Sequence, residues 1–578
     1  MKKRMILALV LLMAGLQIMN AIPAYPGKIV YTQPDGTRIV LQRHGDEFGH
    51  WTTNAAGKVV RKDADGFYRE VSEETVSSIR RSAAARRSEA QLVRAARANA
   101  RAVTGQRHFL VILVEFSDLS YTTCEDPKSS FSALMNEPGY SENGGTGSVH
   151  DYFLDNSNGL FEPIFDVFGP VTLPNEKAYY GESYKRAGQA LIDGCKLLND
   201  GIDFSQYDSD GDGKVDMVLM YYAGYGAADS DDEDSIWPHE GTLGGHGLSL
   251  KLDGVKIDTY ACTNEKTPGD KMCGIGTACH EFGHALGLPD FYDTDFDDNG
   301  FAGGMYSYSV MDSGSYLNDG RTPPYFSFEE RRILGWVSDE DYRYFDATGT
   351  YSISPINSNM VYRTDTDKDG EYFLYENRAK IGWDRYLPEE GLIVYHVDKS
   401  SNRVGFTTAG DLWEERGSFN SINCYGSHPC YYVVPAADQS SLYHYVSGTY
   451  TEKPGFAFPY NEINTYAPIS WSKKKGDVFF RDISFSNQTV TLMAILKTDE
   501  LDYVTIADSE SYRAGDRFVF SLVRPVSVDA PSSVVWYYDD EPAGADSITL
   551  TAGEHTVEAQ LTYADGSKSV LTLEIVAK

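Results

Sequence analysis

The sequence predicts an α+β fold whose later part consists almost entirely of β-strands, and three observations support this prediction. Six consecutive apolar residues at 109–114 are typical of a strand that is buried on both faces. Apolar residues recur with helical spacing at 183–199. From about residue 351 onward, short alternating runs separated by Gly, Pro, Asn and Asp indicate strands joined by turns. At 578 residues, the chain is long enough for about three or four domains.

The N-terminus has the features of a secretory signal peptide. The basic residues Lys2, Lys3 and Arg4 precede a short apolar run at 5–19, and the small residue Ala21 follows it. We expect a signal peptide at residues 1–21, with cleavage after Ala24 as the alternative, and a protein that is secreted, with attachment to a cell surface left open. No later stretch reaches about 18 apolar residues, so we expect no transmembrane span.

A small β-like unit and a basic linker follow the signal. Residues 22–71 carry the turn signals of several short strands. Residues 78–107 are rich in Ala and Arg, contain Glu89 as their single acidic residue, and have little apolar surface to bury. In an exported chain this arrangement suggests a cleavable pro-segment at 22–106, with an activating protease that cuts the Arg-rich linker. An ordinary solvated linker is the alternative.

The rest of the chain divides into three predicted domains. A mixed body spans 107–345, with an expected strand at 215–222 and an expected helix at 275–286. A β-rich domain at 346–498 continues this body. The domain at 499–578 alternates strands and turns around a central tryptophan and resembles an immunoglobulin-like β-sandwich.

The charge of the chain excludes one class of partner and favours another. The chain has 51 Lys and Arg residues against 84 Asp and Glu residues, which gives a formal charge of −33. Such a surface repels a phosphate backbone, so we expect no nucleic-acid binding. An excess of carboxylates suits a soluble surface, calcium sites, or both.

One acidic loop has calcium-binding spacing. Asp208, Asp210, Asp212, Gly213 and Asp216 match the first nine positions of a calcium loop, in which alternate carboxylates surround the cation and Gly makes the sharp turn. The twelfth position lacks the usual Glu, which favours a structural Ca²⁺ over a signalling sensor. A solvated acidic turn is the alternative.

The strongest chemical signal is the pattern His280-Glu281-x-x-His284. Residues four apart lie on one face of a helix, so the two histidines can hold one zinc ion. Glu281 lies beside the first ligand. It can take a proton from a metal-bound water and pass it to the leaving amine, which is the work of a general base and acid.

The residues that follow suggest a third zinc ligand. Gly287 stands one turn after His284, where helices commonly end with a residue at positive φ, and Pro289 prevents the helix from resuming. The chain can then reverse and bring Asp290 to the metal, leaving one position open for water or substrate. An alternative takes the third ligand from Glu329 or Glu330.

A methionine turn follows about 20 residues downstream. We expect Met311 to form an apolar floor beneath the histidines without binding the metal. Tyr306, Tyr308 and Tyr316 lie nearby, and the sequence leaves open which of them, if any, stabilises an oxyanion.

Together these motifs resemble the immune inhibitor A family of secreted bacterial zinc metallopeptidases, whose fold is metzincin-like. The resemblance rests on the zinc motif, the turn around Met311, and the segments 207–213, 236–239 and 391–398. It implies a metzincin-like catalytic domain at 107–345, protein or peptide substrates, and a zymogen whose pro-segment blocks the cleft. No Cys lies between Ile22 and Arg107, so a blocking thiolate is excluded, and a carboxylate or the new α-amine remains.

We therefore expect a secreted zinc endopeptidase that is made as a precursor. The alternative is a calcium-stabilised binding protein, surface-bound or secreted, on an inactive protease scaffold. Of the seven cysteines, Cys424 and Cys430 are close enough to close a small loop, and two of Cys262, Cys273 and Cys279 could pair. The sequence does not indicate the oligomeric state, the cleavage preference or the role of the last domain.

Overall fold

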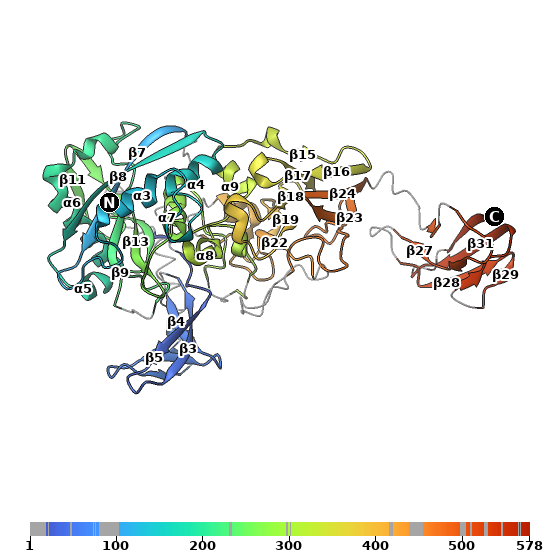
Figure 1. Ribbon diagram of the computed structural model, residues 1–578, viewed down its shortest axis with the longest axis horizontal. Helices are drawn as coiled ribbons and strands as arrows, with labels where there is room; N and C mark the ends of the chain where they lie inside the picture. Colours follow the sequence, from blue (N-terminus) through green and yellow to red (C-terminus); the bar gives the residue numbers. More distant parts are fainter. Residues whose placement is uncertain are drawn as a thin grey trace, which may run out of the picture. The chain divides into compact units, whose positions relative to one another are not determined.

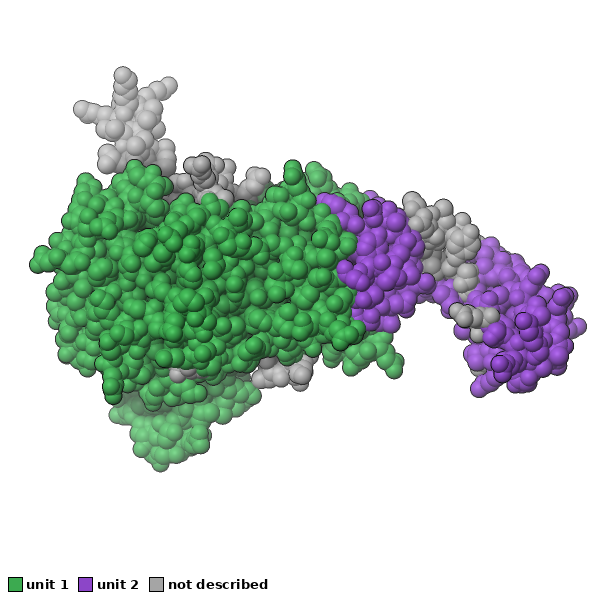
Figure 2. Space-filling view, turned by 45° about the horizontal axis from the view of Figure 1, so that its top comes forward, with its two compact units in different colours: residues 1–343, 353–463, 485–490 green, residues 344–352, 464–484, 491–578 purple. Residues whose placement is uncertain are grey.

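The computed structural model divides into two compact units, which Figure 2 shows in different colours. The first comprises Met1–Arg343, Ile353–Ile463 and Phe485–Val490, and the second comprises Tyr344–Ser352, Asn464–Ser484 and Thr491–Lys578. The structure describes residues 19–20, 22–46, 49–72, 74–75, 77–79, 82, 103–230, 234–295, 299–300, 302–414, 420–437, 455–496, 505–508, 511–524, 530–544, 547–564, 566 and 568–578. Most of the expected signal peptide and of the Arg-rich linker lies outside these residues.

A mixed sheet forms the centre of the first unit. Its strands are ordered β1-β10-β13-β9-β7-β8, and β14 pairs with β13. The strands β8, β7, β9 and β13 run parallel, whereas β10 runs antiparallel to β13, and β1 antiparallel to β10. The strands are β1 Met19–Asn20, β7 Gly105–Glu115, β8 Phe161–Thr172, β9 Val218–Tyr225, β10 His239–Thr242, β13 Thr259–Thr267 and β14 Lys271–Met272.

The apolar run in β7 is continuous because both faces of the sheet are covered. Alternate side chains point to opposite faces, so Val111 packs into one core and Ile112 into another. The first core includes residues of α3 Pro127–Asn136, α4 Val149–Asn156 and α7 Gly276–Leu286, and the second includes residues of α6 Tyr184–Leu198. The helix α7 contacts β13 directly, and Figure 1 shows the two side by side.

The expected elements of this body are found with small shifts. The strand expected at 109–114 is longer, because β7 begins at Gly105. The expected linker through residue 107 therefore ends earlier, since Gly105 and Arg107 already pair with β8. The helices expected at 183–199 and 275–286 are α6 and α7. The strand expected at 215–222 is displaced, because β9 begins only after the acidic loop has closed.

The β-like unit near the N-terminus is a five-stranded antiparallel meander in the order β2-β3-β4-β5-β6. Leu41, Val60 and Tyr68 form its small core. Figure 1 shows β3, β4 and β5 in blue as a sheet of their own. The strands are β2 Lys28–Thr32, β3 Arg38–Gly45, β4 His50–Asn54, β5 Val59–Lys62 and β6 Tyr68–Glu70.

A second antiparallel sheet lies in the first unit after the zinc motif. Its central strands β18 and β19 are buried along their whole length. The sheet includes β17 Val361–Asp365, β18 Glu371–Arg378, β19 Gly391–Asp398 and β22 Tyr431–Val434. The remaining helices of the unit are α5 Lys177–Gly181, α8 Leu317–Gly320, α9 Phe328–Ile333 and α10 Ala409–Glu414.

The second unit consists of strands over the residues that the structure describes. Its C-terminal part has a four-stranded sheet in the order β29-β28-β31-β32 and a pair β26-β30, which share a core around Phe518, Val557 and Ile575. These strands are β26 Arg517–Val519, β28 Ser533–Tyr538, β29 Glu541–Pro542, β30 Ser547–Thr549, β31 Gly553–Thr562 and β32 Lys568–Ala577. The immunoglobulin-like topology of this region stays a prediction.

The disulfide pairs that the sequence allowed are not formed. All seven cysteines are free thiols, and six of them are buried. The Cys424 thiol lies 3.1 Å from the hydroxyl of Thr294, and the Cys430 thiol lies 3.7 Å from the carbonyl oxygen of His428. Short sequence separation therefore did not lead to a bond between Cys424 and Cys430.

Candidate active site

The helix α7 carries the zinc motif and ends as its sequence predicts. Gly287 has a φ of 114°, and its N–H donates to the carbonyl oxygens of Gly283 and His284. The chain then leaves the helix axis and returns with Asp290, which is 1% exposed. His280, Glu281 and His284 are equally buried, so the whole motif lies inside the protein.

Two glycines of α7 permit close packing around the motif. A Cβ at Gly283 would lie 2.7 Å from the sulfur of Met311, so the absence of a side chain lets Met311 pack against the helix between the two histidines. A Cβ at Gly276 would lie 1.9 Å from the carbonyl oxygen of Ser315. The fully buried Met311 therefore stands where the sequence places an apolar floor.

Three side-chain atoms converge beside α7. The Nε2 atoms of His280 and His284 are 3.0 Å apart, and each lies 3.2 Å from Oδ1 of Asp290. A tetrahedral zinc ion with bonds of about 2.0–2.2 Å separates its ligand atoms by about 3.3 Å. The spacing of these three atoms therefore fits one zinc ion.

Hydrogen bonds on the far side of each histidine orient the converging atoms. The Nδ1 of His280 lies 2.7 Å from the carbonyl oxygen of Val310, and the Nδ1 of His284 lies 2.8 Å from that of Leu288. Since a carbonyl only accepts, each Nδ1 carries the proton, and each Nε2 turns a lone pair toward Asp290. The two Nε2 atoms and the carboxylate therefore favour a positive charge between them, from a metal ion or from a proton on one imidazole.

Asp290 is held in place by a residue distant in sequence. Its N–H donates to Oδ1 of Asn420 over 2.8 Å, and the Asn420 amide donates to Oδ2 of Asp290. The other oxygen of Asp290, Oδ1, is buried without a hydrogen-bond partner among the residues that the structure describes. This orphaned acceptor is the one that faces the two imidazoles. Asn420 has no local sequence signature, because it lies 130 positions away from Asp290 and outside any motif.

The pKa values of His280 and Asp290 also show that this group of side chains favours a positive charge. Burial alone would lower the pKa of His280, but the carboxylates of Asp290 and Glu281 outweigh it and raise that pKa to about 9. Burial would raise the pKa of Asp290, yet the facing histidines hold it well below its usual range. The group therefore attracts positive charge, whether it comes from a proton or from a metal.

Glu281 lies beside these atoms and has one occupied oxygen and one open oxygen. Its carboxylate lies within 4.8 Å of the histidine donors. The backbone N–H of Ile22 donates to Oε1 over 3.0 Å, whereas Oε2 is buried without a partner among the described residues. Burial raises the pKa of Glu281 well above its ordinary value. A raised pKa makes a carboxylate a stronger base toward a bound water.

The segment after the expected signal peptide lies across this site. The indole N–H of Trp237 donates to the carbonyl oxygen of Ile22 over 3.1 Å, and the Tyr316 hydroxyl donates to that of Pro23 over 2.6 Å. The N–H of Tyr25 donates to the carbonyl oxygen of Ala228 over 3.0 Å. Upstream, β1 pairs with the sheet edge at β10. The segment thus follows the path of an extended peptide through the site.

Among the three nearby tyrosines, Tyr316 is the one whose hydroxyl reaches this path. Burial raises the pKa of Tyr316 well above its ordinary value, and the charges of Asp229 and Glu281 raise it further. The Tyr308 hydroxyl instead lies in the core near Arg378. The structure therefore places the Tyr316 hydroxyl beside the segment that crosses the site and the Tyr308 hydroxyl in the core, a difference that the sequence did not indicate.

Glu329 and Glu330, the alternative third ligands, are engaged elsewhere. Glu329 accepts hydrogen bonds from Arg332 and pairs with Lys399. Glu330 accepts from the hydroxyl of Ser309 over 2.6 Å and from the N–H of Ser327. Each carboxylate is thus satisfied within the core around α9.

The acidic loop assembles three of its four expected carboxylates. Oxygens of Asp208, Asp210 and Asp212 lie within 4.8 Å of one another. Oδ1 of Asp208 has no hydrogen-bond partner among the residues that the structure describes. Asp216 is not part of this group and instead accepts a hydrogen bond from the Ser209 side chain. A calcium site would therefore use the first three residues, with Asp216 shaping the loop.

Comparisons with known proteins agree with this geometry. Residues 97–334 match the family model of the immune inhibitor A peptidase M6 catalytic domain. The chain is 28% identical over 273 residues to immune inhibitor A of Bacillus thuringiensis subsp. alesti, which covers 39% of each protein. It is 25% identical over 287 residues to the pre-pro-metalloprotease PrtV of Vibrio cholerae serotype O1 (strain M66-2), which covers 40% of this chain and 30% of that protein. The matches thus span about two fifths or less of these relatives.

Solved structures add little. The chain aligns with OgpA from Akkermansia muciniphila over 82% of this chain and 92% of that chain, with 11% identity and a TM-score of 0.21, at which no common fold follows. Among the residues searched, no helix is both long and apolar enough to cross a membrane.

Proposed function

Because residues 97–334 match the family model of the immune inhibitor A peptidase M6 catalytic domain, we propose that this chain is a secreted zinc-dependent endopeptidase made as an inactive precursor. One observation carries the proposal: two imidazole nitrogens and an orphaned carboxylate oxygen converge at 3.0–3.2 Å within a buried site. The rival proposal, a binding protein on an inactive scaffold, predicts the loss of at least one of these residues. All of them are present.

His280, His284 and Asp290 would hold the zinc. When bound, zinc supplies a Lewis acid that polarises a peptide carbonyl and makes water a better nucleophile. The hydrogen bonds to Val310 and Leu288 keep both Nε2 lone pairs available, and Asn420 keeps the Asp290 carboxylate turned toward them. These contacts orient the ligands before any metal arrives.

Glu281 would serve as general base and then as general acid. Its Oε2 is buried and has no hydrogen-bond partner among the described residues, and its raised pKa favours proton uptake by this carboxylate. The Tyr316 hydroxyl would donate a hydrogen bond to a substrate carbonyl, as it does to Pro23. The edge of β10 would hold the substrate backbone, as it holds β1.

Latency would come from the pro-segment itself. If the signal peptide is cleaved after Ala21, the nitrogen of Ile22 becomes an α-ammonium group 3.0 Å from Glu281. That pair would occupy the base and fill the site with residues 22–25. Of the two blocking groups that the sequence left open, this contact favours the α-amine over a carboxylate. Removal of the pro-segment by cleavage in the Arg-rich linker would then activate the enzyme.

Calcium would stabilise the fold and take no part in peptide hydrolysis. The Asp208, Asp210 and Asp212 oxygens lie just before β9, a central strand of the sheet. A cation there would neutralise three adjacent carboxylates and fix the start of that strand.

The test compares the wild-type chain with Glu281→Ala. Both are produced with Ile22 as first residue, cut with trypsin in the linker and freed of trypsin, and casein hydrolysis is then followed. We expect Glu281→Ala to lower the rate about 10²–10⁴-fold while the zinc content, measured by elemental analysis, stays equal. Glu125→Ala, at an exposed turn, is the matched control and keeps the wild-type rate. A folded, zinc-loaded wild type without activity would instead favour the binding protein.

A further inference from the structure

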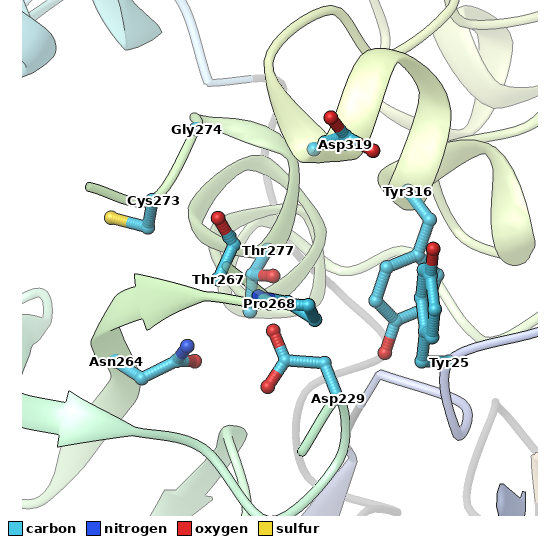
Figure 3. A pocket seen from close by; sticks show the side chains of 11 residues that line it. Tyr25, Asp229, Asn264, Thr267, Pro268, Cys273, Gly274, Thr277, Tyr316 and Asp319 are labelled. Carbon is cyan, nitrogen blue, oxygen red and sulfur yellow. The ribbon is translucent and has the colours of Figure 1, made fainter. Parts of the chain in front are cut away.

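A pocket of about 460 Å³, open solvent included, lies one helical turn from Glu281. Thr277 lines it, and because Thr277 and Glu281 are four residues apart on α7, they share one face of the helix. Figure 3 shows the pocket, with Asp229 pointing into it between Pro268 and the tyrosines, and Asp319 on the opposite side. The pocket therefore opens beside the expected catalytic base.

Asp229 is the unusual member of this lining. It is 7% exposed, and its Oδ1 is buried without a hydrogen-bond partner among the described residues. Burial raises the pKa of Asp229 to about 7, although its own backbone, the Asn264 side chain and the charge of Arg43 lower it in part. A buried acceptor without a donor is costly, and such groups are usually satisfied by a ligand or water.

In the precursor, the pro-segment covers this carboxylate. Tyr25 lines the pocket, and its ring packs edge-on against Tyr316 with centroids 5.2 Å apart. Arg43 of β3 supplies positive charge to Asp229 from one side, since its guanidinium donates to the carbonyl oxygen of the neighbouring Ser230 over 2.7 and 2.9 Å. Both residues belong to the segment whose removal we propose. Activation would thus take away the aromatic cover and the nearby cation together.

The path of the pro-segment indicates which substrate residue would enter. Ile22 lies at Glu281, the residues before it pair with β10, and Tyr25 reaches the pocket three residues later. A substrate that runs in the same direction along β10 would place a residue after the scissile bond in the pocket.

We propose that this pocket binds the side chain of an arginine or lysine on the carboxyl-terminal side of the cleaved bond, with Asp229 as its main partner. This inference rests on the proposed peptidase function. A guanidinium can donate two parallel hydrogen bonds to the Asp229 carboxylate and stack on the ring of Tyr316. Asp319 would add negative charge at the rim, more weakly, because it is 62% exposed and already lies 3.3 Å from Arg321.

The first test maps cleavage sites. Activated enzyme digests denatured casein, and mass spectrometry identifies the new N-termini. We expect Arg and Lys to be enriched within the first four positions after the cut. Two quenched peptides are then made from the best sequence, one with Arg and one with citrulline, which has the same shape and no charge. We expect kcat/KM to be about 10–100-fold higher for Arg, as for a hydrogen bond to a charged group.

Variants then assign that preference to the pocket. Asp229→Asn should bring the Arg-to-citrulline ratio to within about twofold of one, and Asp319→Asn should lower it less. The exposed Asp200→Asn is the matched control and should keep the ratio. Asp319 has a φ of 54°, which Asn tolerates, so this variant should fold even if Asp229→Asn does not.

Three results would overturn the inference: no enrichment of basic residues, equal rates for Arg and citrulline, or a ratio that neither variant changes. If Asp229→Asn does not fold, an unchanged ratio in Asp319→Asn decides against it. If no protein substrate is cleaved at all, the peptidase proposal itself fails, which is a distinct outcome.

Discussion

The backbone nitrogen of Ile22 lies 3.0 Å from Oε1 of Glu281, although 259 positions separate the two residues in the chain. Ile22 is 1% exposed and packs with Trp237, Ala227 and Ala228. The contact therefore joins the first residue after the expected signal peptide to the expected catalytic base. The group that contacts Glu281 therefore depends on where the chain begins: it is an ammonium if Ile22 is the first residue and an amide N–H if it is not.

The first prediction concerns this amine. A precursor that begins at Ile22 should be more latent than one that begins at Met19, because only the former places an ammonium group against the Glu281 carboxylate. Hydrolysis of a short peptide by each uncut precursor measures the difference. We expect several-fold more residual activity from the longer form. Equal activity before cleavage, together with equal activity after it, would show that the charge contributes nothing to latency.

The second prediction concerns the third zinc ligand. Asp290→Ala should lose zinc, because it removes one of three converging ligand atoms. Elemental analysis after dialysis should find well below one zinc per chain, against about one in the wild type. Glu125→Ala serves again as the exposed control. A full zinc content in Asp290→Ala would assign the third ligand elsewhere.

The third prediction concerns Asn420, which exchanges two hydrogen bonds with Asp290. Asn420→Ala should keep the zinc site but weaken it, because outer contacts typically change metal affinity about 10–100-fold. Competition with a chromophoric chelator measures the zinc Kd. An unchanged Kd would contradict a positioning role.

The fourth prediction concerns the acidic loop. Calcium added to desalted protein should raise Tm, since at 100 times its Kd a ligand stabilises the folded state by about 2.7 kcal/mol. Asp210→Asn and Asp212→Asn should abolish the shift, whereas Asp200→Asn should keep it. A calcium-dependent Tm that survives both loop variants would place the cation at another site.

The fifth prediction concerns the pH dependence of precursor stability. The pKa of Asp229 is raised in the folded chain from 3.8 to about 7, so its stabilising contribution is complete below about pH 4 and is lost as the pH rises through 7. The groups that face it are the Arg43 guanidinium, Asp319 across the pocket, and four groups whose pKa values are raised above their ordinary values, namely Tyr25, Tyr225, Cys273 and Tyr316.

Asp229→Asn has no such loss. Between pH 4 and pH 8, the wild-type precursor should therefore lose up to about 4 kcal/mol relative to this variant. Thermal unfolding of both proteins across this range measures the difference, with Asp319→Asn as control. A difference that is constant with pH would contradict the prediction.

The sequence alone determined the parts of the site that depend on local geometry. The spacing of His280 and His284 on one helical face, the end of the helix at Gly287 and the return of Asp290 all follow from the helical repeat and from the conformational freedom of glycine. The buried strand at 109–114 was equally clear, because a strand covered on both faces has no polar positions. Disulfide pairing could not be predicted in the same way, because the spacing of cysteines along the chain does not show where their side chains point.

Only the tertiary structure decided which distant residues meet the motif. Asn420 contacts Asp290 across 130 positions, and Ile22 contacts Glu281 across 259 positions. Asp229 becomes a buried acceptor beside the pro-segment, whose removal we propose. None of these contacts has a local signature, because each depends on the order in which the strands assemble. The helical repeat acts over a few residues, whereas a sheet brings together residues that are hundreds of positions apart.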